Sequence, residues 1–222
     1  MERGIFITFE GTEGCGKTTQ LKLLAEALLS SGFDTITTRE PGGCDIADKI
    51  RGILLNPENL GLDSTAELLL FAAARAQHVG EVIRPALEKG QVVLCDRFTH
   101  STSAFQGHGR GLDHSTILWL NKIATGSLRP HLTLILDVQV EEGLRRAQER
   151  NGDENQPEAR FDNEQLSFHK RVRSGYDLMA ENEDDICKMV DGTGTVAEVA
   201  NRIADVVTAF IGSRVFGEAT NA

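Results

Sequence analysis

One octapeptide near the N-terminus constrains the fold more than any other part of the sequence. Residues 11–18 read Gly-Thr-Glu-Gly-Cys-Gly-Lys-Thr, which fits the pattern Gly-x-x-x-x-Gly-Lys-Thr. The glycines allow a tight turn that brings several backbone N–H groups close to an anion, and a following helix points its positive dipole end at the same place. Lys17 adds a mobile positive charge, and Thr18 offers a hydroxyl to a magnesium ion that bridges phosphates.

The residues on either side supply the context that this loose pattern needs. The apolar run at residues 5–9 predicts a strand before the loop. Leucine and alanine then recur at helical spacing from Leu21 to Leu28, which predicts a helix directly after it. A phosphate-binding loop lies between a strand and a helix, so the site is expected to hold a nucleoside triphosphate. Its expected residues are Gly11, Thr12, Glu13, Gly14, Cys15, Gly16, Lys17, Thr18 and Thr19.

Composition narrows the class of protein. The chain has 222 residues, of which 40% are hydrophobic, enough for one domain with a sizeable core. Its formal charge of −10 argues against binding to a nucleic-acid polymer, because that binding requires clustered Lys and Arg. The four cysteines lack the spacing of a zinc site or of a secreted disulfide framework. We see no signal peptide and no uncharged run of about 20 apolar residues, so we expect a cytoplasmic protein with no membrane partner.

Strands and helices are predicted to alternate along the chain. The expected strands are residues 5–9, 34–39, 92–95, 132–136 and 186–190. This alternation predicts an α/β fold with a doubly wound, five-stranded parallel sheet flanked by helices, and ligands outside the carboxyl ends of the strands. We expect a single domain over residues 1–212 and a frayed tail over residues 213–222.

Three local patterns add detail to this outline. Ser64 and Glu67 have the spacing of a capping box that opens a helix. Residues 98–111 are polar and then rich in glycine, which predicts a helical turn followed by a flexible loop. Residues 148–162 are strongly polar and are the best candidate for a mobile lid.

Charged residues follow the predicted strands. Arg39, Asp96 and Arg97 stand at the ends of the second and third strands, where a parallel sheet binds ligands. GTPases read guanine with Asn-Lys-x-Asp, whereas residues 121–124 read Asn-Lys-Ile-Ala, and a motor or transport ATPase usually has a longer chain. The sequence therefore favours a small phosphotransferase that closes over two substrates.

The chain resembles the bacterial thymidylate kinases over nearly its whole length. The motifs that carry the resemblance are residues 9–19, 38–43 (Thr-Arg-Glu-Pro-Gly-Gly), 70–75 (Leu-Phe-Ala-Ala-Ala-Arg), 96–98 (Asp-Arg-Phe), 101–107, 109–111, 129–130 and 136–138. The resemblance implies a P-loop nucleoside monophosphate kinase fold with a lid, ATP and Mg²⁺ as cofactors, dTMP as substrate, and a homodimer. The implied reaction moves the γ-phosphoryl group of ATP to dTMP and gives dTDP and ADP.

The resemblance also assigns roles to the charged residues. Lys17 and the loop amides would hold the β- and γ-phosphates of ATP. Thr18 and Asp96 would hold magnesium, Asp96 directly or through water. Arg39 and Arg97 would clamp the phosphate of dTMP. On the residues alone, a second interpretation stays open, in which Arg97 merely pairs with Asp96.

Glu13 is unusual because it places a carboxylate among anions. The resemblance implies that it reaches the 3′-hydroxyl of deoxyribose, and the alternative is a solvated loop charge. Cys15, in the same loop, is either a thiol with a lowered pKa or a small residue that fills a tight turn.

A second group of residues would bind the base. The resemblance implies that Phe71 stacks on thymine, that Arg75 donates to a base carbonyl, and that Thr102 and Gln106 complete the pocket. On the sequence alone, Phe71 is more simply a core residue. Phe105 departs from the family, where tyrosine is frequent at this position, and it loses the phenol hydrogen bond. We hypothesise that discrimination against ribonucleotides is weaker as a result.

The charge that builds up during transfer needs a further cation, because the phosphate loop has no arginine. The resemblance implies a lid arginine, and Arg160 matches best, with Arg150 and Arg146 behind it. The alternative is that these are solvated lid charges.

Two other functions are compatible with a phosphate loop. A deoxynucleoside kinase would need a general base in place of a phosphate-binding arginine, so Arg39 and Arg97 favour a monophosphate acceptor. A non-catalytic nucleotide-binding module would not need Lys17, Thr18 and Asp96 together with Arg160.

Overall fold

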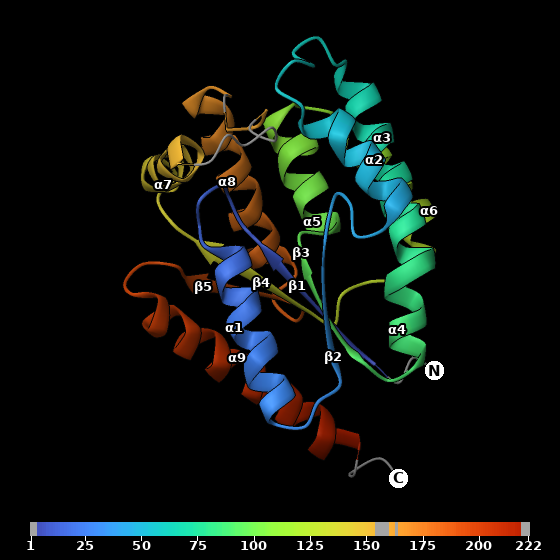
Figure 1. Cartoon of the computed structure of the whole chain (residues 1–222), viewed down its shortest axis with the longest axis vertical. Coiled ribbons are helices and arrows are strands. Elements are labelled where there is room, and N and C mark those ends of the chain that lie inside the picture. Colours follow the sequence, from blue (N-terminus) through green and yellow to red (C-terminus); the bar gives the residue numbers. More distant parts are fainter. Residues whose placement is uncertain (1–3, 154–159, 163, 219–222) are drawn as a thin grey trace.

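The computed structural model describes residues 4–153, 160–162 and 164–218. Within them, five strands form one parallel sheet in the order β2-β3-β1-β4-β5 (Figure 1). Their bounds are β1 (Ile5–Glu10), β2 (Thr35–Arg39), β3 (Val92–Asp96), β4 (Leu132–Asp137) and β5 (Cys187–Asp191). The predicted α/β class and the five strands are confirmed.

Helices cover both faces of this sheet (Figure 1). Their bounds are α1 (Lys17–Ser30), α2 (Asp45–Leu55), α3 (Ser64–His78), η1 (Val79–Ile83), α4 (Arg84–Glu88), α5 (Thr99–Thr102), η2 (Ser103–Gly109), α6 (His114–Thr125), α7 (Val140–Asp153), α8 (Leu166–Asn182) and α9 (Val196–Glu218). Two of them, η1 and η2, are π-helices.

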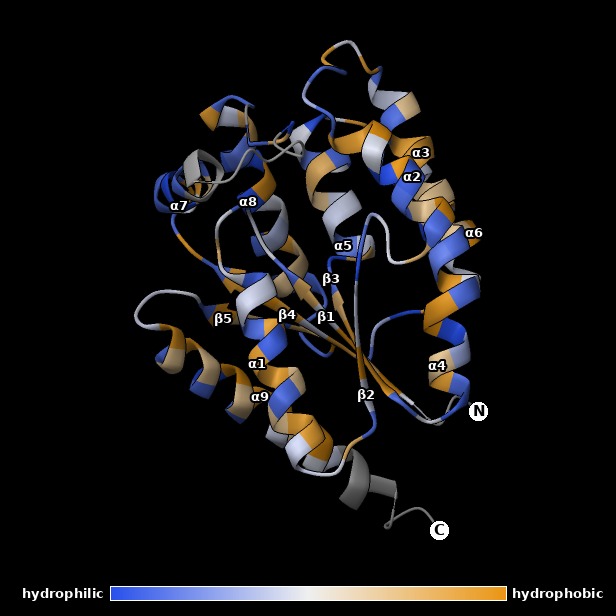
Figure 2. Ribbon diagram, in the orientation of Figure 1, coloured by the Kyte–Doolittle hydropathy of each residue, from blue (hydrophilic) through white to orange (hydrophobic). Residues whose placement is uncertain are grey.

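The central strands are buried on both faces because they consist of apolar residues almost throughout (Figure 2). Alternate residues of β1 point to opposite sides: Ile7 and Phe9 pack with residues of α1 and α9, whereas Phe6 packs with residues of η1 and α4. The sheet is therefore held between two helical layers, and its carboxyl edge is left as the place for polar residues.

The predicted capping box is wrong. The residue that caps α3 is Asp63, whose side chain accepts hydrogen bonds from the backbone N–H groups of Thr65 at 2.8 Å and Ala66 at 3.2 Å. Ser64 is the first helical residue, and Glu67 is buried in ion pairs instead of reaching back to the helix start.

The flexible loop predicted after residue 98 is also wrong up to Gly109, because α5 and η2 keep this segment helical. The glycine there serves close packing: a Cβ on Gly109 would lie 2.6 Å from a ring carbon of Phe168 in α8. In a sequence, a glycine that allows close packing between helices looks the same as a glycine that makes a loop flexible.

Part of the predicted lid falls outside the described residues. Helix α7 runs to Asp153 and so includes the first lid residues, 160–162 are described, and 154–159 are not. Helix α9 continues to Glu218, beyond the end expected near Gly212, and residues 219–222 fall outside the described part. Among the described residues, none of the helices has the length and apolar character of a bilayer span.

Candidate active site

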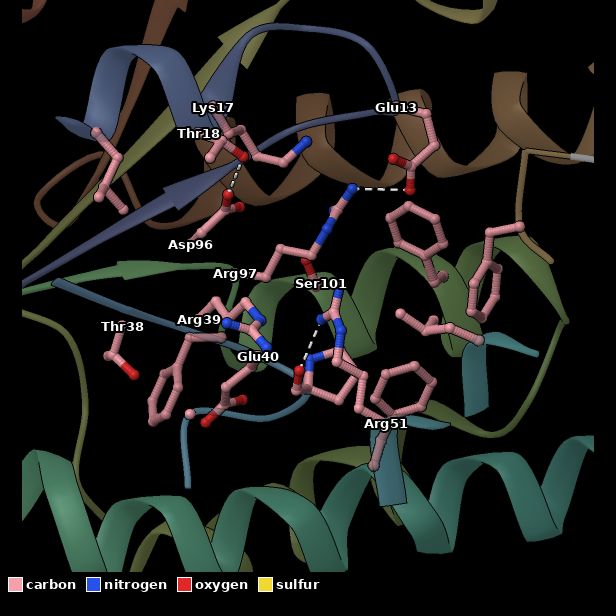
Figure 3. A pocket seen from close by; sticks show the side chains of 18 of the residues that line it. Glu13, Lys17, Thr18, Thr38, Arg39, Glu40, Arg51, Asp96, Arg97 and Ser101 are labelled. Atoms are coloured by element: carbon pink, nitrogen blue, oxygen red, sulfur yellow. Dashed lines mark hydrogen bonds and ion pairs between the residues drawn. The ribbon is translucent and has the colours of Figure 1, made fainter. Parts of the chain in front are cut away.

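A cavity of about 910 Å³ lies at the carboxyl edge of the sheet, between the phosphate loop, the ends of β2 and β3, and helices α2, α3 and α5 (Figure 3). Most residues predicted from the sequence line it, namely Glu13, Gly14, Gly16, Lys17, Thr18, Thr19, Arg39, Phe71, Arg75, Asp96, Arg97, Thr102, Phe105 and Gln106. Gly11, Thr12 and Cys15 belong to the loop but do not line the cavity, and neither does Arg160.

The phosphate loop packs tightly on the rest of the fold. A Cβ on Gly14 would lie 1.8 Å from the carbonyl oxygen of Gly143 in α7, and Gly14 has a φ of +68°. Only glycine fits such an approach at this backbone angle. Helix α1 starts at Lys17 after Gly16, with no side-chain cap, so its first N–H groups keep their capacity to bind an anion.

Lys17 is buried and held over the loop. Its Nζ donates to the carbonyl oxygens of Gly11 at 3.2 Å and Thr12 at 2.8 Å, and to Sγ of Cys15 at 3.4 Å. The hydroxyl of Thr12 is buried without a hydrogen-bond partner among the described residues. Cys15 is itself 2% exposed, which supports its interpretation as a small residue that fills the turn.

Thr18 and Asp96 meet although they are far apart in the sequence. The hydroxyl of Thr18 donates to Oδ2 of Asp96 at 2.6 Å (Figure 3). Asp96 ends β3, and its register partner in β1 is Phe9, just before the phosphate loop. A hydroxyl and one carboxylate beside a phosphate site suit Mg²⁺, which binds through few protein ligands and keeps several waters.

Arg97 extends from the end of β3 toward Glu13 (Figure 3). Its Nη2 donates to Oε1 of Glu13 at 2.8 Å, and its Nη1 donates to the carbonyl oxygen of Gly11 at 3.0 Å. The interpretation in which Arg97 merely pairs with Asp96 is wrong, since Glu13 is its ion-pair partner. Burial would lower the pKa of Arg97, but neighbouring acidic groups, Glu13 first, outweigh burial and raise the pKa.

Arg39 and Arg51 also line the cavity. Arg39 is adjacent because its register partner in β3 is Asp96, and its side chain is 54% exposed and pairs with Asp48 at 3.1 Å. Arg51 was not predicted from the sequence, and it lines the cavity from α2 and donates to the carbonyl oxygen of Pro41 at 2.7 Å. The sequence does contain a sign of this position. Helix α2 closely follows the turn at Pro41, and a basic residue about two helical turns into such a helix can reach back to the turn.

The predicted base-binding residues line the same cavity. Arg75 is buried: Nε donates to Glu40, Nη1 to Thr102 and Asn121, and Nη2 to the carbonyl oxygen of Phe98, at 2.7–3.0 Å. A guanidinium has five N–H groups. These bonds use four, so within the described structure one N–H on Nη2 is left for a ligand.

Gln106 and the aromatic residues also line the cavity. The amide nitrogen of Gln106 donates to Glu67 at 2.8 Å. Phe71 and Phe105 both face Phe161, with ring centroids 6.1 and 5.5 Å from it. The centroid of Phe105 also lies 4.9 Å from the guanidinium carbon of Arg97.

Glu40 is the buried counter-ion of this region. Its Oε2 accepts from Arg75 at 2.7 Å and its Oε1 lies 3.0 Å from Nδ1 of His78. Burial alone would raise the pKa of Glu40, but Arg75 and His78 together outweigh burial and hold the pKa below its ordinary value. The carboxylate thus stays charged and fixes Arg75 in place.

Arg160 departs from its predicted role. It is 6% exposed, donates through Nη2 to Glu67 at 2.6 Å, and donates through Nε to the carbonyl oxygen of Leu54. Arg160 is therefore neither a solvated lid charge nor a residue that lines the cavity. Glu67 is 1% exposed, and a carboxylate so buried needs a cationic partner, which Arg110 and Arg160 supply. Arg146 is engaged with Glu142, and the side chain of Arg150 lies outside the described part.

Comparison with known proteins identifies the family. The family model described as thymidylate kinase matches residues 9–203. A thymidylate kinase of Geotalea uraniireducens is 54% identical over 207 residues, which cover 93% of this chain and 97% of the relative. That of Syntrophotalea carbinolica is 56% identical over 199 residues, covering 89% and 92%. A crystal structure of thymidylate kinase from Ehrlichia chaffeensis superposes with a TM-score of 0.74 at 34% identity, covering 92% of this chain and 98% of that one. The cavity, which contains a phosphate loop and several arginines, agrees with these matches. The chain belongs to the thymidylate kinase family.

Proposed function

We propose that this cavity holds dTMP and the phosphate end of ATP together for the reaction of the family. A phosphate oxygen of dTMP bonds to the γ-phosphorus of ATP as the bond from that phosphorus to the β-γ bridging oxygen breaks, which gives dTDP and ADP. Such transfers depend on positioning and on neutralising charge. The observation that carries the proposal is that Lys17, Arg39, Arg51 and Arg97 all line the one cavity.

The ATP side is the phosphate loop. The N–H groups at the start of α1 and the ammonium of Lys17 would bind the β- and γ-phosphates. Thr18 and Asp96 would hold Mg²⁺, which supplies positive charge to the phosphates when bound.

The acceptor side begins at Arg97. This guanidinium, with Arg39 and the previously missed Arg51, would bind the phosphate of dTMP, because planar donors suit a phosphate. Glu13, already bonded to Arg97, would receive the 3′-hydroxyl of deoxyribose.

The base would lie between the aromatic residues and Arg75. Phe71 offers a ring, Arg75 one N–H for a base carbonyl, and Thr102 and Gln106 complete the wall. Phe105, which packs against Arg97, would face the sugar. The single domain with a lid and the cytoplasmic location expected from the sequence stay predictions.

The acceptor assignment is tested with a coupled assay of ADP release on dTMP, dUMP and thymidine. We expect much higher kcat/KM with dTMP than with thymidine, and a fall of about 10²- to 10³-fold with dTMP in Arg97→Met, since losing one partner of a desolvated charge pair costs about 2–5 kcal/mol. Arg129→Met, at an exposed ion pair with Glu183, is the control and should leave the rate unchanged. Preferred turnover of thymidine, or an Arg97→Met variant as active as the wild type, would overturn the assignment.

We also propose that the protein is a homodimer that associates through the layer of α2, α3 and α6. The large apolar residues exposed on these helices are Ile46, Ile53, Leu69, Leu118, Trp119 and Ile123. Exposed apolar residues gathered on neighbouring helices mark an interaction surface, and most soluble oligomers are homo-oligomers, with symmetric dimers the commonest.

Trp119→Glu should convert such a dimer to a monomer. Trp119 is 61% exposed in the single chain, so the change leaves the fold intact while it places a charge in the interface. Light scattering behind a sizing column measures the mass of each form. Leu29→Glu is the matched control, because Leu29 is a 53% exposed apolar residue on α1, outside the proposed layer. A monomeric wild type, or a Trp119→Glu variant that stays dimeric, would contradict the proposal.

A further inference from the structure

Arg97 has a backbone conformation that needs support. Its φ is +73°, in the left-handed region, where a residue with a Cβ is disfavoured. The end of β1 holds the chain on both sides of it. The N–H of Arg97 donates to the carbonyl oxygen of Phe9 at 2.9 Å, and the N–H of Phe98 donates to Oε1 of Glu10 at 2.7 Å. The side chain of Glu10 thus fixes the peptide that turns Arg97 toward the cavity.

The other oxygen of Glu10 binds two hydroxyl groups. Oε2 accepts from Oγ of Ser101 at 2.5 Å and from the phenol of Tyr176 at 2.9 Å. Glu10 is 0% exposed, so this carboxylate has exchanged its hydration for one backbone N–H and these two hydroxyls. Ser101 lies in α5 and Tyr176 in α8, which means that β1, α5 and α8 meet at one carboxylate.

Ser101 connects this carboxylate to the guanidinium of Arg97. Nη1 of Arg97 donates to Oγ of Ser101 at 3.1 Å. A hydroxyl has one proton to donate, so when it donates to Glu10 it must present a lone pair to Arg97. Glu10 therefore sets both the backbone angle of Arg97 and the orientation of one acceptor for its side chain.

We propose that Glu10 is a positioning residue for binding of the acceptor phosphate, acting through Arg97 with Tyr176 as its support. It does not line the cavity, so it would not touch the substrate. The proposal rests on the proposed role of Arg97 in binding the phosphate of dTMP. It predicts that Glu10 contributes to the recognition of the phosphate group and not to that of the nucleoside.

Calorimetric titration with dTMP and with thymidine separates these contributions. In Glu10→Gln the amide oxygen still accepts from Phe98, but the NH₂ group cannot accept from Ser101 and Tyr176. We expect the Kd of dTMP to rise about tenfold and the Kd of thymidine to stay within about twofold of the wild-type value, since tenfold corresponds to the loss of one hydrogen bond of ordinary strength. Tyr176→Phe should raise the ratio of the Kd of dTMP to the Kd of thymidine as well, but by less. It provides the test if Glu10→Gln fails to fold.

Thr8→Val is the matched control. Thr8 is a fully buried polar residue of the same strand, and its hydroxyl lies 2.9 Å from that of Thr133, away from Arg97. Loss of this hydroxyl should leave the ratio of the Kd of dTMP to the Kd of thymidine unchanged. An equal weakening of dTMP and thymidine in Glu10→Gln and Tyr176→Phe would show a merely structural role and overturn the proposal.

A double-mutant cycle separates the positioning role of Glu10 from the phosphate-binding role of Arg97. If Glu10 acts through Arg97, Glu10→Gln has no further effect on the Kd of dTMP in an Arg97→Met background. Additive effects would overturn the positioning role while the role of Arg97 stands. An Arg97→Met variant with an unchanged ratio of thymidine to dTMP affinity would overturn both.

Discussion

Lys17→Met is expected to lower kcat by about 10²- to 10³-fold, the usual cost of removing one preorganised group that stabilises developing charge. The ammonium donates hydrogen bonds to the carbonyl oxygens of Gly11 and Thr12. These are neutral partners that exchange readily for phosphate oxygens. Methionine has a similar length and no charge, so the fold should persist and the loss should appear in turnover, measured by ADP release at saturating dTMP.

Lys89→Met is the control for this prediction. Lys89 is exposed and follows α4, outside the cavity, so its replacement should leave kcat unchanged. A Lys17→Met variant with wild-type kcat would show that another group carries the charge of the transferred phosphoryl.

Glu40→Gln is expected to lower the free energy of unfolding at pH 7 by about 3–5 kcal/mol, because removing one partner of a buried ion pair leaves the other charge uncompensated. Arg75 is 2% exposed and cannot regain water in the folded state. Urea unfolding at pH 7 measures the change. Glu142→Gln is the comparison: its pKa is lowered to about 2 by hydrogen bonds from Arg145 and Arg146, but it is exposed, so its loss should hardly change stability.

The buried ion pair of Glu40 and Arg75 also predicts how the stability of the protein depends on pH. The pKa of Glu40 is lower in the folded protein than its ordinary value of 4.5. Its contribution is therefore fully present above pH 4.5 and is lost as the pH falls through the folded pKa. The stability difference between the wild type and Glu40→Gln should shrink below pH 4.5. A difference that stays constant or grows on acidification would contradict the assigned ion pair.

The parts of the fold that could be predicted from sequence are those set by local chemistry. The apolar runs, the phosphate loop and the strand-end charges predicted the sheet and most of the cavity, because parallel strands bring their carboxyl ends to one edge. The interpretation of Glu67 as a cap failed because its partners, Arg110 and Arg160, come from distant parts of the chain.

The sequence pointed to Arg160 as a residue of the site and did not point to Arg51, and both errors have the same cause. A family motif placed Arg160 in the site, but a buried carboxylate from α3 binds it elsewhere. Arg51 belongs to none of the motifs that carry the family resemblance, and it lines the cavity because α2 packs beside the turn at Pro41. Which charges meet is decided by packing between elements, and single-sequence patterns do not report that.

The position of two phosphate groups tests most directly whether one cavity holds both nucleotides end to end. A crystal structure of the protein with dTMP and a non-hydrolysable ATP analogue measures it. We expect the phosphate of dTMP within about 3 Å of the Arg97 guanidinium, and the γ-phosphate between it and Nζ of Lys17. A complex with dTMP phosphate bound away from Arg97, or with the two phosphates in separate clefts, would contradict the proposed site.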